Sequence, residues 1–550
     1  MAVRADLETA LRSASEAIGV KDVPDLELGR AKNPDHGDYA SSAGLKLARA
    51  LRQPPNQIAA RLAEVIEIPE VAATAQAVGG YVNFRLSDAW LQGRIEKVAA
   101  GGPGYGASDI GRRERIQVEF LSVNPTGPLH IGHGRGAILG DSLARLLEFT
   151  NHDVEREYYV NDQNTQARMF GESVYARLHG DPPPERGYTG EYVSELADMA
   201  RRELPGVEKL QHDEAEPKLR AFAIAAMVDR IRASVGRINV RYDEWFPESR
   251  LWAEGLPQLA IERLREGGYL KEREGALWFG PALEEEDGLG EQVIAEDESR
   301  VVIRSTGEPT YFASDLGYLL SRFERRHFNR VVEVWGADHH GYVPRVRAAL
   351  RALGLPDDFF HAELVQLVRV MRGGEEVRIS KRTGEIVTLR ELLEETGVDA
   401  ARYFFLMRRG DSQFVFDVDL AKSQKDENPV YYVQMAHARM SGIFRVAGRE
   451  PDAVSADGVD LSVLTAPEEV DLLNELAAFP VVVARSAETY EPHRITGYLE
   501  GLARIAHPWY HKYRVLGEPE EAARLVLARA VQQVLANGLA ILGIRAPDRM

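Results

Sequence analysis

The stretch that decides the fold is residues 115–136, RIQVEFLSVNPTGPLHIGHGRG. Its first part, 115–122, alternates apolar and polar residues, which predicts a β-strand. Its second part, 124–128, holds an asparagine, two prolines and a glycine, which predicts a turn. From Ile131 onward, leucines recur at three- and four-residue spacings, which predicts a helix. A strand, a tight turn and a helix therefore follow one another directly.

The predicted helix begins with an unusual number of glycines. Gly132, Gly134, Gly136 and Gly140 should each cost roughly 1 kcal/mol of helix stability relative to alanine. We expect a ligand or a neighbouring strand to approach the backbone closely there. Free N–H groups at a helix N-terminus also bind anions, and a phosphate held there would lie beside the two histidines that flank the first glycine.

Those four residues, His130-Ile131-Gly132-His133, resemble the HIGH motif of class I aminoacyl-tRNA synthetases. The flanks extend the match, since residues 124–137, NPTGPLHIGHGRGA, are similar to the arginyl-tRNA synthetase family in particular. The alternative for these four letters alone is a plain strand–turn–helix with incidental histidines. Further matches in the same order along essentially the whole chain favour the family.

Composition and charge narrow the class of protein. Among 550 residues, 44% are hydrophobic and 28% charged, as in an ordinary globular protein, and the length predicts about two to four domains. No apolar run approaches the ~18 residues of a transmembrane helix, and the first residues lack the apolar core of a signal peptide. We therefore expect no membrane contact and a cytoplasmic location. The absence of cysteine excludes disulfides and thiolate zinc sites.

The net charge of −18 argues against unspecific binding to nucleic acid, although it does not exclude an RNA partner. Three arginine clusters are present, and we interpret each as a solvated face rather than a phosphate site. They are Arg112, Arg113 and Arg115; Arg322, Arg325 and Arg326; and Arg345, Arg347 and Arg351.

Periodicity and linkers divide the chain into four parts. Residues 1–105 alternate short helical and strand-like pieces, which predicts an α+β module closed by the glycine-rich linker 99–111. Residues 112–365 alternate strand and helix patterns, which predicts a parallel α/β sheet, with a helical insertion at about 167–235. Residues 366–424 hold a basic loop and connecting helices. Residues 425–550 are almost all helical, which predicts a helix bundle.

The resemblance gives each part a role. It implies a fold of the α/β class, with a Rossmann-like parallel-sheet catalytic domain between an N-terminal α+β module that binds the tRNA body and a C-terminal all-α bundle that binds the anticodon. Exposed Tyr81 and Asn83, in the pattern GGYVNF, are expected to stack on and bond to a nucleotide. The last residue, Met550, is expected near the anticodon. The alternatives are an internal hydrophobic contact for the first two residues and a frayed tail for the last.

A second chemical stretch is residues 377–384, VRISKRTG. It resembles KMSKS, the loop of class I synthetases, although Arg378 and Arg382 replace its first lysine and last serine. The central Ser380 and Lys381 are retained, and the resemblance places that lysine on phosphate.

The resemblance implies a two-step reaction on ATP, L-arginine and tRNA(Arg). The arginine carboxylate attacks the α-phosphate, which releases pyrophosphate, and the terminal ribose of tRNA then takes the arginyl group. His130 and His133 are expected to donate to the α-phosphate, Gly132 to leave room for the nucleotide, and Ser380 and Lys381 to hold the pyrophosphate. Mg²⁺ is expected with ATP, mostly on phosphates and water. The family is expected to need bound tRNA for the first step.

Arginine recognition needs carboxylates, because a guanidinium bonds a carboxylate in bidentate fashion and lysine cannot copy that geometry. By resemblance, Glu119 and Asn124 lie at the backbone end of the amino acid, while Tyr311 and Asp315 meet the guanidinium, with His339 nearby. Sequence physics alone leaves the assignment of the carboxylates open, and Asp315 has the alternative of a helix N-cap. Since neighbours in a predicted strand point to opposite faces, adjacent His339 and His340 are not expected to share a metal ion, and no protein metal site is predicted.

Three other functions stay open at this point. A cysteinyl-type class I synthetase would need a cysteine-rich zinc site, and a nucleotidylyltransferase with an HxGH motif would be much shorter. A catalytically impaired tRNA-binding paralogue is disfavoured by the presence of both histidines and Lys381. We expect a monomer.

Overall fold

The computed structural model describes residues 2–31, 33–280, 300–377 and 388–550. The KMSKS-like stretch, with Ser380 and Lys381, lies outside the described residues. The chain divides into two compact units. Unit 1 comprises Met1–Ser108, Gln424–Thr489 and Arg494–Met550, and unit 2 comprises Asp109–Ser423 and Tyr490–His493.

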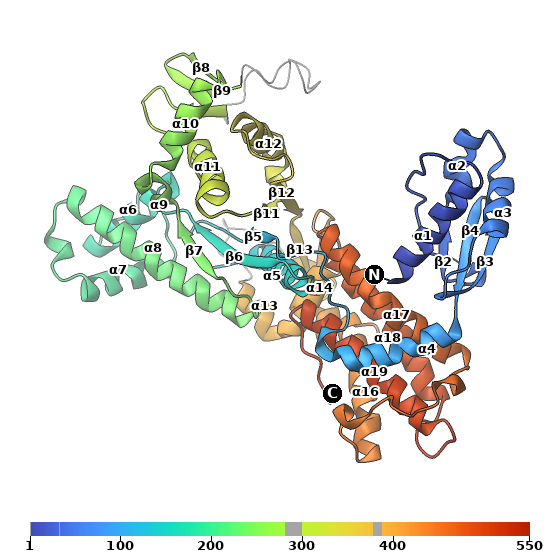
Figure 1. Cartoon of the computed structure of the whole chain (residues 1–550). Helices are drawn as coiled ribbons and strands as arrows, with labels where there is room; N and C mark the ends of the chain where they lie inside the picture. The colour runs from blue at the N-terminus through green and yellow to red at the C-terminus, as the bar shows by residue number, and fades with distance from the viewer. Residues whose placement is uncertain (1, 32, 281–299, 378–387) are drawn as a thin grey trace. The chain divides into compact units, whose positions relative to one another are not determined.

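Unit 2 is built on a five-stranded parallel sheet with the strand order β12-β11-β5-β6-β7 (Figure 1). The first strand in the chain is central, the next two follow on one side, and the last two lie on the other, which is the doubly wound order of a Rossmann-like fold. The strands are β5 (Arg115–Phe120), β6 (Asp153–Val160), β7 (Glu244–Pro247), β11 (Arg330–Gly336) and β12 (Phe360–Val365).

Both faces of this sheet are covered, so β5 is buried on both sides although its sequence alternates. Ile116, Val118 and Phe120 lie on the face against helix α5 (Ile131–Phe149), and the intervening Gln117 and Glu119 are buried on the other face. Helix α11 (Tyr311–Leu320) covers that second face. The strand, the turn and the helix predicted for 115–136 are confirmed, with the helix beginning at Ile131.

The helical insertion and the remaining helices surround the sheet. They are α6 (Thr165–His179), α7 (Glu191–Glu203), α8 (His212–Arg237), α9 (Glu248–Ala253), α10 (Leu256–Glu266), α12 (Val343–Ala352), α13 (Leu389–Thr396), α14 (Val398–Leu406) and α15 (Val418–Lys422). A further three-stranded sheet contains β13 (Val368–Arg372), β14 (Glu375–Val377) and β15 (Phe414–Asp417).

Two local predictions for this unit need correction. Within the region 112–365 predicted to form a parallel sheet, strand β10 (Val301–Ile303) instead pairs antiparallel with β9 (Ala276–Phe279), in a separate sheet with β8 (Leu270–Arg273). The turn between β8 and β9 explains this hairpin, because both of its residues have positive φ. His339 and His340 do not lie in a strand, since β11 ends at Gly336 and a 3₁₀ turn (Ala337–Tyr342) follows.

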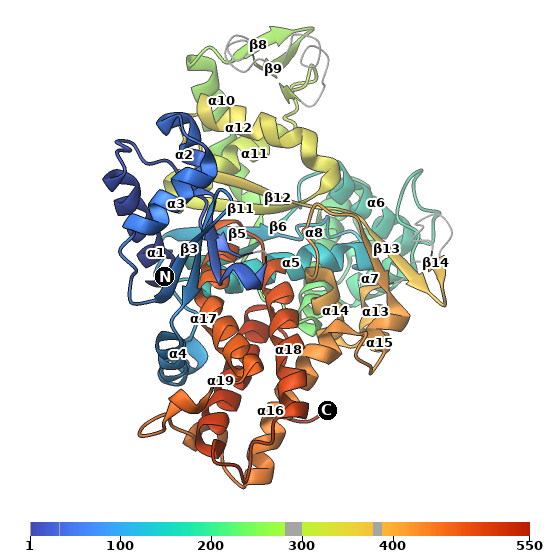
Figure 2. The ribbon, with the colours of Figure 1, turned by 90° about the vertical axis from the view of Figure 1, so that its right-hand side faces the viewer.

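Unit 1 contains a four-stranded antiparallel sheet with short helices and a bundle of long helices (Figures 1 and 2). The sheet has β1 (Gly29–Arg30), β2 (Tyr39–Ser41), β3 (Ala72–Val78) and β4 (Tyr81–Leu86), with helices α1 (Ala2–Ala17), α2 (Ala43–Leu51), α3 (Pro55–Val65) and α4 (Asp88–Gly101). The bundle has α16 (Pro429–Ala447), α17 (Pro467–Glu488), α18 (His493–Lys512) and α19 (Glu521–Ile541). The predicted fold class, a parallel α/β unit together with an α+β module and an all-α bundle, is confirmed. Among the described residues no helix combines the length and the apolar character needed to cross a bilayer.

Candidate active site at the switch point of the parallel sheet

The order of the sheet marks where a ligand binds. In the sheet, β6 lies on one side of β5 and β11 lies on the other. The connections that follow β5 and β11 therefore leave in opposite directions at the carboxyl ends of these two strands. In open α/β sheets, ligands bind in the crevice at such a switch point. The residues that enter it are the 121–130 loop, the first turn of α5 and the 3₁₀ turn after β11.

The two histidines of the HIGH-like motif are brought together at the start of α5. His130 is the N-cap, with φ −104° and ψ 168°, and its backbone N–H donates to Nδ1 of His133 over 3.3 Å. Their rings stack with centroids 3.4 Å apart. Because Nδ1 of His133 accepts, the proton of its neutral ring lies on Nε2. The same helix start provides backbone N–H groups, so the local chemistry is that of an anion site.

The four glycines of this helix differ in how much space surrounds them. A Cβ at Gly140 would collide with the Phe120 ring on β5, and one at Gly134 would lie 2.7 Å from a methyl carbon of Leu389. A Cβ at Gly132 would lie 3.1 Å from the His130 ring, while at Gly136 nothing lies within 4 Å among the described residues. The predicted close approach of another strand is therefore confirmed at Gly140, where the contact is a side chain of β5.

The loop between β5 and α5 is held by side-chain hydrogen bonds to neighbouring elements as well as by a turn of its own. Leu121 has φ +71°, an uncommon conformation for a residue with a side chain. The hydroxyl of Ser122 accepts from the backbone of Tyr159 at 3.0 Å on β6. The side chain of Asn124 donates to Gln166 at 2.9 Å and accepts from Asn164 at 2.7 Å. Both partners belong to the start of α6, so the Asn124 amide has a fixed orientation.

Asp315 faces the crevice from α11. The helix begins at Tyr311 with Thr310 as N-cap, so the N-cap alternative for Asp315 is wrong. The hydroxyl of Tyr342, from the turn after β11, donates to the Asp315 carboxylate. Burial raises the pKa of Asp315 to about 7. Nearby acids add to this rise in pKa, and the hydrogen bond from Tyr342 opposes it. One turn earlier, the side chain of Tyr311 is 49% exposed at the open end of the helix.

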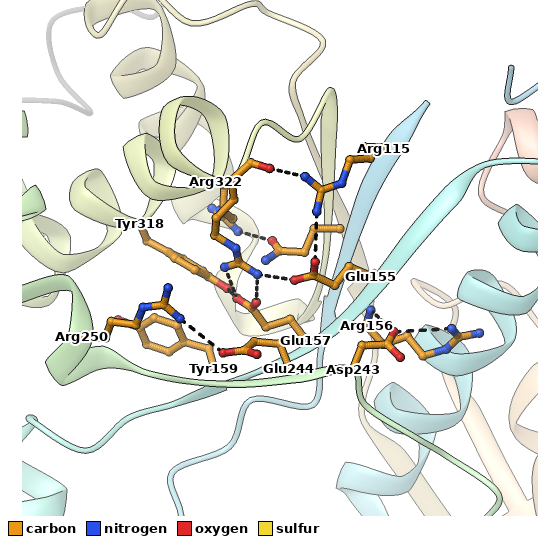
Figure 3. Close-up of polar contacts among 12 residues, drawn as sticks. Arg115, Glu155, Arg156, Glu157, Tyr159, Asp243, Glu244, Arg250, Tyr318 and Arg322 are labelled. Atoms are coloured by element: carbon orange, nitrogen blue, oxygen red, sulfur yellow. Dashed lines mark hydrogen bonds and ion pairs between the residues drawn. The ribbon is translucent and has the colours of Figure 1, made fainter. Parts of the chain in front are cut away.

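Glu119 lies at the end of β5 in an acidic row. It is 7% exposed and paired in register with Glu333 on β11 and with Glu157 on β6. Burial and the neighbouring Glu333 raise the pKa of Glu119 well above its usual range. Tyr318 and Arg326 both bond Glu157, and Figure 3 shows Tyr318 and Glu157 pointing toward each other.

The interpretation of the second arginine cluster as a solvated face is wrong for two of its three members. Arg322 is 2% exposed and forms an ion pair with Glu333, while Arg326 pairs with Glu155 and Glu157. Both follow α11, whose apolar face packs on the sheet and directs them onto the glutamates. Arg325, between them, is exposed as expected.

Several residues at this crevice were not predicted from the sequence. They are Tyr342, which bonds Asp315; Glu333 and Arg322, which face Glu119; and Glu248, whose carboxylate accepts from Ser314 on α11. The available signal was a charged residue in an otherwise apolar stretch, as at Glu333 in VVEVW. His339 lies three residues before Tyr342 on the same turn, and its side chain is 59% exposed.

The candidate tRNA contacts lie in unit 1, and they differ in how far their side chains are exposed. Tyr81 is 45% exposed at the start of β4, and Met550 is 51% exposed. The expected exposure of Asn83 is wrong, because it is 4% exposed between β2 and β3. Helices pack on this sheet, so three consecutive residues from Val82 are buried whichever face they take. The tRNA contacts of all three residues stay predictions.

Three family models together match nearly the whole chain. The arginyl tRNA synthetase N terminal domain matches residues 2–86, and the class I (R) tRNA synthetase catalytic domain matches 101–180 and 187–439. The DALR anticodon binding domain matches 433–550. The chain belongs to the arginyl-tRNA synthetase family.

Members of the arginyl-tRNA synthetase family align with this chain end to end. The arginine–tRNA ligase of Desulforudis audaxviator is 42% identical over 576 residues, covering 100% of this chain and 99% of that protein. That of Carboxydothermus hydrogenoformans is 40% identical over 561 residues, with coverage of 100% and 99%. The Thermus thermophilus arginyl-tRNA synthetase structure is 27% identical, with a TM-score of 0.76 and coverage of 100% of both chains. Membership of this family implies ATP, arginine and tRNA as substrates, and neither a cysteinyl-type synthetase nor a small nucleotidylyltransferase is favoured.

Proposed function

We propose that this chain attaches L-arginine to tRNA(Arg) through an arginyl-adenylate. A carboxylate oxygen of arginine attacks the α-phosphorus of ATP, and the bond to the β-phosphate oxygen breaks to release pyrophosphate. A ribose hydroxyl at the 3′ end of tRNA then attacks the arginyl carbonyl, and AMP leaves. The observation that supports this function best is one crevice with two chemistries, a helix start with two imidazoles and a pocket of buried carboxylates.

The helix start suits the phosphates. His130 and His133 are stacked and partly exposed, and the hydrogen bond within the motif leaves the proton of neutral His133 on Nε2. From there the two rings and the backbone N–H groups of α5 donate to the α-phosphate as negative charge builds on it, with Gly132 leaving room for the nucleotide. By sequence resemblance, Ser380 and Lys381 hold the pyrophosphate. Such catalysis is mainly positioning and charge stabilisation.

The carboxylates suit the cationic substrate. Tyr311 and Asp315 stand one turn apart on α11, and we assign them to the guanidinium, with His339 at the open edge. Glu119 and Asn124 lie at the other end, on β5 and the loop that follows it, and we assign them to the α-ammonium and carboxylate of arginine. Buried acids without enough fixed cations favour a ligand that carries positive charge at both ends.

Mg²⁺ is a natural companion of the ATP phosphates in this reaction. In the part of the chain that the structure describes, no three His, Asp or Glu residues gather in a geometry that could hold a metal ion. The groups at the start of α5 are donors, which fit phosphate oxygens rather than a cation. Mg²⁺ would therefore be carried by phosphate oxygens and water, where it neutralises phosphate charge.

The other parts of the chain are assigned to tRNA. We propose that the N-terminal module, residues 1–105, binds the tRNA body through Tyr81 and Asn83, and that the bundle, residues 425–550, binds the anticodon with Met550 nearby. Exposure of Tyr81 and Met550 suits such contacts, whereas buried Asn83 would act through the backbone around it. We further propose a monomer acting in the cytoplasm, where its tRNA substrate is used.

The test is amino-acid-dependent exchange of pyrophosphate into ATP, run across all amino acids with and without tRNA, together with charging of tRNA by labelled arginine. Arginine alone should support both reactions, and exchange should need tRNA. Charging of another amino acid in preference to arginine would overturn the proposal. Tight tRNA binding without exchange would favour the impaired paralogue.

A further inference from the structure

Three buried glutamates stand side by side across the centre of the parallel sheet. Glu333 on β11 is paired in register with Glu119 on β5, which is paired with Glu157 on β6. Registered residues of parallel neighbours point to the same face, and their strands lie about 4.8 Å apart. All three side chains are less than 9% exposed, so their like charges repel through a medium of low dielectric. Such a row needs buried cations close to it.

Arg322 supplies one cation at the switch point. It belongs to the π-helical turn Ser321–Arg325 directly after α11. Its Nη1 forms the ion pair with Glu333 and lies 3.4 Å from the side-chain oxygen of Gln117, two residues before Glu119 on β5. The ring of Tyr318 lies against its guanidinium, with Cζ 3.9 Å from the ring centroid. The guanidinium is therefore fixed between β11 and β5 by its contacts with both strands.

Other charged groups around Glu119 and Asp315 are already engaged. Arg326 is committed to Glu155 and Glu157, one strand further away. The groups that face the two carboxylates from the packed elements are Glu333 from β11, Glu157 from β6, Glu248 from α9, Arg322 after α11, Tyr342 from the turn after β11 and Ser122 from the loop after β5. Acids outnumber cations in this set, and Arg322 is the cation in it, whereas Tyr342 stabilises the Asp315 carboxylate by a hydrogen bond.

We propose that Arg322, held by Glu333, is a positioning residue for arginine recognition that keeps Glu119 and Asp315 able to ionise without touching the substrate. This inference rests on the proposed function. It also explains why a helix with an otherwise apolar face ends in a π-helical turn, since such turns are rare and occur mainly at functional sites.

The two partners should act in opposite directions. Arg322 lowers the pKa of both Glu119 and Asp315, whereas Glu333 raises the pKa of both. Arg322→Met should therefore move the pH at which arginine binding reaches half its maximal strength upward. Glu333→Gln should move it downward. Arg322→Lys, which keeps the charge but not the fork, should restore the wild-type midpoint with weaker binding.

The experiment is direct arginine binding by equilibrium dialysis with labelled arginine from pH 5.5 to pH 9, on the full chain, with thermal melting recorded for every variant. The pH range is chosen to bracket the pKa of Asp315, about 7. Arg263→Met is the matched control, because it breaks an arginine–glutamate pair with Glu324 on the same π-helical turn at a position about one third exposed. That variant should leave the pH midpoint unchanged.

The outcomes separate this inference from the proposed function. A wild-type chain that does not bind arginine overturns both. If the folded Arg322→Met variant keeps the wild-type pH midpoint, the role of Arg322 alone is overturned, whatever Glu333→Gln does. If Arg322→Met does not fold, the polar variant Arg322→Gln decides, and an unshifted or downward midpoint in that variant overturns the inference.

Discussion

The pH dependence of arginine binding is the most direct measure of the acidic pocket. Asp315 is surrounded by protein, which raises its pKa to about 7, although Tyr342 donates a hydrogen bond to its carboxylate. The guanidinium of the substrate stays protonated at every accessible pH. Binding that pairs the two therefore requires Asp315 to lose its proton, so arginine should bind more tightly as the pH rises through 7.

The size of the effect follows from that pKa. The ionised fraction of Asp315 rises from about one tenth at pH 6 to about nine tenths at pH 8, so the dissociation constant should fall about tenfold between these values. Glu119, whose pKa also lies well above its usual range, adds to the same trend. Above pH 8 the contribution of Asp315 should level off.

Direct binding of labelled arginine, without ATP or tRNA, isolates this step from catalysis. Asp315→Asn keeps the shape of the side chain and its contact with Tyr342 but cannot ionise. It should weaken arginine binding far more than ATP binding, and its profile should lose the tenfold change. A wild-type dissociation constant that is constant between pH 6 and pH 8, or a variant profile parallel to the wild type, would refute the pairing of Asp315 with the guanidinium.

Three further predictions use other parts of the site. Gly140→Ala should destabilise the fold by up to about 2 kcal/mol, because the collision with a β5 side chain costs about 1–3 kcal/mol against a gain in helix propensity of about 1 kcal/mol. Gly136→Ala, where no atom of the described residues lies within 4 Å of the added Cβ, should stabilise it by up to about 1 kcal/mol. Urea unfolding of the pair checks the difference, and equal effects would contradict the reasoning. His133→Asn should keep an acceptor for the backbone N–H of the N-cap yet slow adenylate formation about 100-fold in pyrophosphate exchange, because a phosphate donor is lost. Lys381→Ala should also slow adenylate formation about 100-fold while a filter-binding assay shows tRNA affinity nearly unchanged; a parallel loss of tRNA affinity would place that lysine elsewhere.

Local signals account for what could be predicted from the sequence. The start of α5 at Ile131 and that of α11 at Tyr311 follow from turn residues before a helical pattern. The break between α13 and α14 follows from Gly397, which has φ +77°. Each of these depends on residues within one or two turns, which periodicity captures.

The features that could not be predicted from the sequence depend on which strands are neighbours in the sheet. The pairing of Glu333 with Glu119 joins residues more than 200 positions apart, and periodicity gives the face of a strand but not the register of its neighbour. Arg322 could not be distinguished from exposed Arg325 by residue type. Likewise, the sequence does not distinguish Gly136 from Gly140, although Gly140 packs against Phe120 of β5 and Gly136 does not.

The proposed selectivity for arginine follows from the protonation of the buried carboxylates in the pocket. A pocket whose buried acids outnumber its buried cations must retain protons when no ligand is present, and the raised pKa values of Glu119 and Asp315 express that need. A ligand with a permanent cation replaces a proton and lets the carboxylate ionise. A neutral analogue of the same shape, with a urea group in place of the guanidinium, cannot do so and leaves either a protonated acid or an unpaired buried charge. Lysine supplies the charge but not the planar fork. Rejection of both analogues therefore needs no additional steric barrier in the pocket.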